Sequence, residues 1–178
     1  MFEDNYQCSE NFKLKDIIHC GETWNKYKHI VNNTPIEPET IKAISLLCRN
    51  ILEPVQKEFG KIIPTYGFAS YDLTKKIKNR IYPKLDQHSG YEKNKKGDYI
   101  CRRLGQAVDF YIPGINSKKI CKWITLNTPF DRLYFYGEDR PIHVSIGPEN
   151  KKQIILMRKY NNKQYIPKVI NKFEDLFS

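Results

Sequence analysis

The chain has 178 residues, a length that suits one domain with its own hydrophobic core. Lys and Arg number 30 against 20 Asp and Glu, and the net charge of +10 favours an anionic partner or surface. There is no run of about 18 apolar residues, and the N-terminus is polar and acidic, so we expect a protein without membrane span or signal peptide, made in the cytoplasm. The five cysteines show no C-x-x-C spacing and are expected to be mostly small buried residues.

The N-terminal half is predicted to be mainly helical. A short amphipathic segment covers residues 12–18, and between Pro38 and Gly60 apolar residues recur at helical spacing. Pro54 lies inside this long helix. We expect it to kink the helix or to end its first part, because proline lacks the backbone donor and clashes with the preceding turn.

Strand character dominates after a polar, Lys-rich stretch at 79–98, which we predict to be a long functional loop. Around it we expect strands at 61–66, 106–112, 132–136, 142–146 and 153–157, a small-residue turn at 67–70, and helices at 71–78 and 117–126. This order predicts a single α+β domain over residues 1–178, with N-terminal helices packed on a small antiparallel sheet.

Two polar residues interrupt apolar strands and are the first candidates for a site. Asp109 lies within AVDFYI, and His143 lies within PIHVSI. A buried carboxylate must be paired, hydrogen-bonded or bound to metal, because an unpaired buried charge costs several kcal/mol. Taken singly, each fits a structural role, as an ion-paired carboxylate and a hydrogen-bonded core histidine. Together they supply two of the three protein ligands that a catalytic zinc site needs.

Several blocks follow one another in a characteristic order. They are 51–55 (ILEPV), 67–70 (GFAS), 105–110 (GQAVDF), 127–133 (NTPFDRL), 142–145 (IHVS) and 150–154 (NKKQI). Their succession, over about Phe12 to Met157, resembles the M15 peptidases, which are zinc D-alanyl-D-alanine carboxypeptidases and phage peptidoglycan endopeptidases of the hedgehog/DD-peptidase fold. The resemblance implies a phage-derived zinc metallopeptidase that hydrolyses peptidoglycan peptide cross-links and reaches the cell wall after lysis.

The resemblance also implies a Zn²⁺ site, in which Asp109 and His143 match the second and third ligands. The family's first ligand is the histidine of an S-x-H-x-x-G-x-A-x-D block. Counted back from Gly105 this position is Arg102, whose guanidinium has no lone pair for a metal. His88, in the run DQH, resembles the S-Q-H that opens the block and is the alternative first ligand, with an insertion before Gly105. An enzymatic activity depends on whether His88 completes the site.

The general base that the resemblance implies is altered as well. A zinc hydrolase uses a carboxylate to take the proton of the attacking water and pass it to the leaving amine. The positions from which the family supplies it are occupied here by Tyr136 and Arg140. Glu138 and Asp139 lie in the same connection and are the candidate replacements.

A second hypothesis dispenses with the metal. If Arg102 and Arg140 both face the former zinc pocket, and Asp109 pairs with one of them, the site becomes a cationic cleft that grips phosphate or carboxylate. Tyr136 and neighbouring aromatic residues then stack on a ring or base. The protein is in that case a binding protein or repurposed enzyme for a nucleotide or another small anionic ligand. The Lys-rich segments also suit nucleic acid, although no ordered nucleic-acid-binding motif is present.

Overall fold

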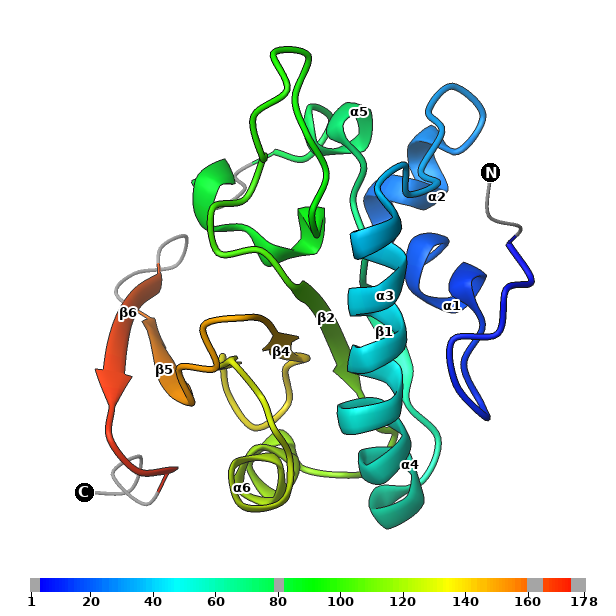
Figure 1. The fold of residues 1–178 in the computed structure, drawn as a ribbon. Helices are drawn as coiled ribbons and strands as arrows, with labels where there is room; N and C mark the ends of the chain where they lie inside the picture. Colours follow the sequence, from blue (N-terminus) through cyan, green and yellow to red (C-terminus); the bar gives the residue numbers. More distant parts are fainter. Residues whose placement is uncertain (1–3, 79–81, 160–164, 174–178) are drawn as a thin grey trace.

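A six-stranded sheet runs through the centre of the computed structural model, which describes residues 4–78, 82–159 and 165–173 (Figure 1). The strand order is β1-β2-β4-β3-β5-β6. The strands are β1 (Ile63–Tyr66), β2 (Gln106–Tyr111), β3 (Arg132–Phe135), β4 (Ile142–Ile146), β5 (Gln153–Lys159) and β6 (Tyr165–Ile170). Helices pack against this sheet, so the prediction of an α+β domain is confirmed.

The prediction of a purely antiparallel sheet is wrong, because β3 and β5 run parallel. All other neighbouring strands are antiparallel. The chain turns back from β3 into β4, which lies between β3 and β2, and β5 then enters on the free side of β3 in the direction of β3. The outer strand β6 was not expected, since five of its six residues are exposed and it lacks an alternating apolar pattern.

The long predicted helix is present in three consecutive parts, α3 (Pro38–Leu47), the π-helical turn η1 (Cys48–Leu52) and α4 (Glu53–Phe59). Figure 1 shows α3 and α4 as one column beside β2. Pro54 lies in the first turn of α4, where its missing backbone donor costs least. The N–H of Glu53 donates to the carbonyl of Cys48, five residues earlier, so the expected interruption is a local π turn.

The other helical elements are short, apart from α6. They are α1 (Leu14–Ile18), α2 (Glu22–Tyr27), α5 (Tyr71–Thr74), the 3-10 turns η2 (Pro83–Leu85) and η3 (Gln87–Ser89), and α6 (Ser117–Asn127). α5 is thus shorter than the predicted helix at 71–78, and α2 was not predicted. In the described part of the chain, no helix combines the length and the apolar character that a membrane crossing requires.

The two faces of the central strands have different partners. Val108 and Phe110 of β2 and Val144 of β4 belong to the main apolar core, on the side where α3 packs against both strands. Because side chains alternate along a strand, Asp109 and His143 point to the opposite face. There the turn η3 contacts β2. The sheet therefore separates its core from a polar site. Four of the five cysteines are buried, as predicted.

Candidate metal centre

β2 and β4 hold two of the predicted site residues side by side. Asp109 and His143 are direct cross-strand partners, and Oδ1 of Asp109 lies 2.8 Å from Nδ1 of His143. On the other side of His143, its partner in β3 is Tyr134, whose ring meets the imidazole edge-on at a centroid distance of 4.8 Å. The Tyr134 hydroxyl accepts a hydrogen bond of 3.0 Å from Arg103. The carboxylate and the imidazole are thus fixed by strand register and by a packed ring.

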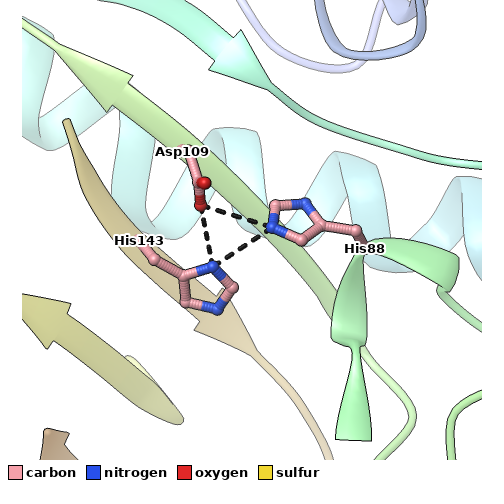
Figure 2. A group of neighbouring side chains, drawn as sticks. All are labelled: His88, Asp109 and His143. Atoms are coloured by element: carbon pink, nitrogen blue, oxygen red, sulfur yellow. Dashed lines mark hydrogen bonds and ion pairs between the residues drawn. The ribbon is translucent and has the colours of Figure 1, made fainter. Parts of the chain in front are cut away.

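The turn η3 adds His88 to this pair, as Figure 2 shows. Nε2 of His88 lies 3.1 Å from Nδ1 of His143 and 3.3 Å from Oδ1 of Asp109. The available ligand atoms of the three residues all lie within 4.8 Å of one another. His88 and His143 are buried, whereas the Asp109 side chain keeps 25 % of its surface exposed. The structure therefore brings together the three residues predicted as metal ligands, with one open side at Asp109.

The other ring nitrogen of His88 is already engaged. Nδ1 lies 2.7 Å from the carbonyl oxygen of Gly67. Since a carbonyl only accepts, Nδ1 carries the hydrogen, and in the neutral ring the lone pair is on Nε2, the atom that faces Asp109 and His143. Metal-binding histidines in proteins usually hold their second nitrogen in this way. The ring of Tyr66 covers His88 at a centroid distance of 4.0 Å.

A buried hydrogen-bond network holds the turn that carries His88. Asp86 caps the turn by accepting from the backbone N–H of His88 at 3.1 Å. The Gln87 side chain donates to Asp131 and accepts from the hydroxyl of Ser145, both at 2.9 Å. Gln87 and Asp131 are almost fully buried. No role was expected for either residue, although Gln87 lies in the run DQH and Asp131 in the block 127–133, because their partners are distant in sequence and no local pattern points to them.

The charges of the cluster support one another. Burial alone opposes ionisation of Asp109, but the neighbouring His88 and His143 outweigh it and hold the pKa of the carboxyl below its ordinary value. Burial likewise opposes protonation of His88, and the Asp109 carboxylate outweighs it and raises the pKa of the imidazole. The carboxylate thus requires a positive partner. Two imidazole nitrogens and one carboxylate oxygen are a ligand set that zinc accepts, so these residues fit a metal ion.

In the described part of the chain, the predicted general bases make no hydrogen bond or ion pair with this cluster. The Glu138 carboxylate accepts from the side-chain amide of Asn116 at 2.7 Å and lies 4.0 Å from the ammonium of Lys118. Glu138 and Asp139 line a pocket of about 580 Å³, and His88, Asp109 and His143 are not among its lining residues. Asp139 makes no side-chain hydrogen bond or ion pair with the described residues.

The two arginines of the metal-free hypothesis line different pockets. Arg140 and Tyr136 line a pocket of about 380 Å³ together with Asp109. Arg102 lines a separate pocket of about 750 Å³ beside Tyr99. Asp109 itself is paired with the two histidines. Arg140 and Tyr136 are therefore near the candidate metal centre, and Arg102 belongs to another surface.

The fold and the cluster together define an α+β protein with a His-Asp-His group that could hold a metal ion. Comparisons with protein-family models, with curated proteins and with solved structures find no match for this chain.

Proposed function

We propose that the protein is a zinc-dependent hydrolase of the M15 peptidase type, acting on peptidoglycan peptides. The observation that carries this proposal is the convergence of His88, Asp109 and His143, together with the bond from His88 to Gly67 that leaves Nε2 free as a ligand. Three protein ligands with an open position are typical of catalytic zinc, whereas structural zinc sites are closed by four.

The exposed side of Asp109 marks the direction from which substrate approaches, since this side lines the 380 Å³ pocket. Zinc held by the three residues would supply Lewis acidity, which polarises a scissile carbonyl and acidifies a water. Tyr136 lines the same pocket, and burial and the nearby Asp109 raise the pKa of its phenol. Its hydroxyl thus stays protonated and is suited to donate a hydrogen bond to a substrate oxygen.

For the proton transfer we favour Asp139 over Glu138. Glu138 is already bound to Asn116, whereas Asp139 has no partner among the described residues. Asp139 also directly precedes Arg140, which lines the pocket beside Asp109. We therefore expect Asp139→Asn to lower kcat by about a hundredfold or more and Glu138→Gln to lower it by less than tenfold, with zinc content unchanged in both. Equal loss in both variants would remove this assignment.

Zinc binding and cell-wall hydrolysis test the proposal separately. Titration calorimetry and elemental analysis are expected to give one zinc per chain, with binding lost in His143→Ala and retained in His29→Ala, a control at an exposed histidine. The zinc-loaded protein should release peptide from purified peptidoglycan, lose this activity to a chelator and regain it with zinc. Equal zinc affinity of wild type and His143→Ala would overturn the metal centre. Zinc binding without peptide release would contradict only the proposed peptidoglycan substrate and leave the metal centre in place.

A further inference from the structure

The pocket beside Asp109 has a distinctive polar lining. Its volume is about 380 Å³, within the lower part of the range for small-molecule sites. The polar side chains that line it are those of Thr65, Asp109, Tyr136, Arg140, Lys159 and Tyr165. Every one except Asp109 can donate a hydrogen bond, so the pocket is rich in donors.

Sheet topology brings these donors together from distant parts of the chain. Lys159, the last residue of β5, pairs directly with Tyr165, the first residue of β6. Tyr136 follows β3, the other neighbour of β5, and its ring meets that of Tyr165 edge-on at 6.0 Å. Arg140 reaches the same pocket from the connection before β4. The two cations are thus held by separate elements around a shared space.

Among the described residues, no neighbour neutralises the positive charges in the pocket. The side chains of Arg140 and Lys159 form no ion pair or hydrogen bond with the described residues. Asp109 is the one carboxylate among the lining residues. Its Oδ1 is paired with Nδ1 of His143 at 2.8 Å and with Nε2 of His88 at 3.3 Å. The pocket therefore presents a guanidinium and an ammonium group to whatever ligand enters it.

We infer that Arg140 and Lys159 form an oxyanion subsite beside the candidate metal centre, and that the substrate carries a carboxylate or phosphate group there. The role of this group in a substrate rests on the proposed function, whereas its binding can be measured alone. The guanidinium supplies a planar pair of donors and the ammonium a point charge, the usual partners of both oxyanions. The pocket size suits one such group with a few attached atoms. A carboxylate implied at the position of Arg140 by the peptidase resemblance is thus replaced by a group of opposite charge.

Calorimetric titration of the full chain with two probes, inorganic phosphate and N-acetylglycine, tests the subsite. Each titration is made on chelator-treated protein and on zinc-loaded protein, since only the second can hold an anion on the metal. We expect Arg140→Gln and Lys159→Gln each to lower the affinity for the more tightly bound probe by about tenfold or more. Arg158→Gln is the matched control for Lys159, because neighbouring residues of a strand point to opposite faces. Arg102→Gln is the control for Arg140.

Each outcome has a defined meaning. A tenfold loss in both variants but not in the controls, in either form of the protein, supports the subsite, and the tighter probe identifies carboxylate or phosphate. Equal affinity in wild type and variants, or no binding of either probe to wild type in both forms, overturns it. Variant-sensitive anion binding by a chain that takes up no zinc would keep the subsite and overturn the proposed function. Thermal unfolding curves identify any variant that does not fold.

Discussion

His88 donates a hydrogen bond from Nδ1 to the carbonyl oxygen of Gly67 across 2.7 Å, and this bond determines which ring nitrogen faces Asp109 and His143. Gly67 packs so closely against Ile17 of α1 that there is no room for a side chain at this position. A Cβ atom at this residue would lie 2.1 Å from the carbonyl oxygen of Ile17. A tightly packed stretch of backbone therefore orients the first of the three candidate ligands.

Gly67→Ala should accordingly weaken zinc binding without touching a ligand. The added methyl group must displace either Gly67 or Ile17, which moves the carbonyl that orients His88. We expect a loss of zinc affinity of about ten- to a hundredfold and a loss of stability of about 1–3 kcal/mol. Zinc titration and denaturant unfolding measure the two effects. Gly60→Ala is the control, because, apart from its chain neighbours, no atom of the described residues lies within 4 Å of its added Cβ, although its φ of +96° strains the variant. Similar zinc affinity in Gly67→Ala and wild type would contradict the orienting role.

Gln87→Ala tests the network under the turn. The substitution removes the donor to Asp131 and the acceptor of Ser145, both buried, and should cost about 1–3 kcal/mol of stability. Because the turn then loses its anchor, we expect zinc affinity to fall about tenfold. Gln56→Ala removes a hydrogen bond from the N–H of Ile62, away from the site, and serves as control. If both variants bind zinc equally well, Gln87 has no positioning role.

These positioning contacts explain how far the sequence could predict the site. Alternation along a strand is a local rule, so Asp109 and His143 could be singled out within their strands as candidate ligands, and the structure makes them cross-strand partners. His88 lies on a turn whose place depends on Gln87 and Gly67, residues whose partners are distant in sequence. The sequence left open whether His88 or Arg102 belonged to the cluster, because spacing along a loop does not determine position in space.

The same distinction applies to the fold and to the candidate general bases. The long helix, α6 and most strands follow from periodicity, whereas the parallel pairing of β3 with β5 depends on strand order, which no local pattern encodes. Glu138 was correctly placed in the connection between β3 and β4. The hydrogen bond from Asn116, the N-cap of α6, orients the Glu138 carboxylate, and the sequence could not show this contact.

Glu92 shows that part of the segment between His88 and Gly105 is structural. Its buried carboxylate accepts hydrogen bonds from the backbone N–H groups of Ile36 and Glu37, at 3.1 Å each, and from the hydroxyl of Thr40 at 2.9 Å. These groups lie at the N-terminal end of α3, where a negative charge is favourable. The segment between His88 and Gly105 thus stabilises the long helix.

Glu92→Gln should therefore lower the free energy of unfolding by about 1–2 kcal/mol. The amide carries no negative charge, and its NH₂ group would face the N–H and hydroxyl donors that now bind the carboxylate. Lys93→Gln removes an exposed ion pair with Glu37 and a cation–π contact with the Tyr99 ring, and should cost clearly less stability than Glu92→Gln. Denaturant unfolding compares the two variants, and zinc affinity should be unchanged in both. A larger loss in Lys93→Gln than in Glu92→Gln would show that the capping role is mistaken.

The ion pair between His88 and Asp109 predicts how the stability of the metal-free protein depends on pH. The pKa of His88 is raised above its ordinary value of 6.5, since the Asp109 carboxylate outweighs the effect of burial. Its contribution is thus fully present below pH 6.5 and is lost as the pH rises through the raised value. The pKa of Asp109 is lowered from 3.8, so its contribution is present above that pH and is lost as the pH falls through the lowered value. The pair should stabilise the metal-free protein most between about pH 4 and 6.5.

Unfolding of chelator-treated protein at about pH 6 and about pH 8.5 should therefore show a loss of stability with rising pH that is absent in His88→Gln. Zinc should reverse the trend, because its binding requires neutral histidines and competes with the proton on His88. The stabilisation that zinc gives to the wild type is thus expected to grow between the same two pH values. His29→Ala should behave like wild type with and without zinc, since His29 is exposed and far from the cluster in sequence. Parallel pH profiles of wild type and His88→Gln would show that the imidazole and the Asp109 carboxylate are not coupled in solution.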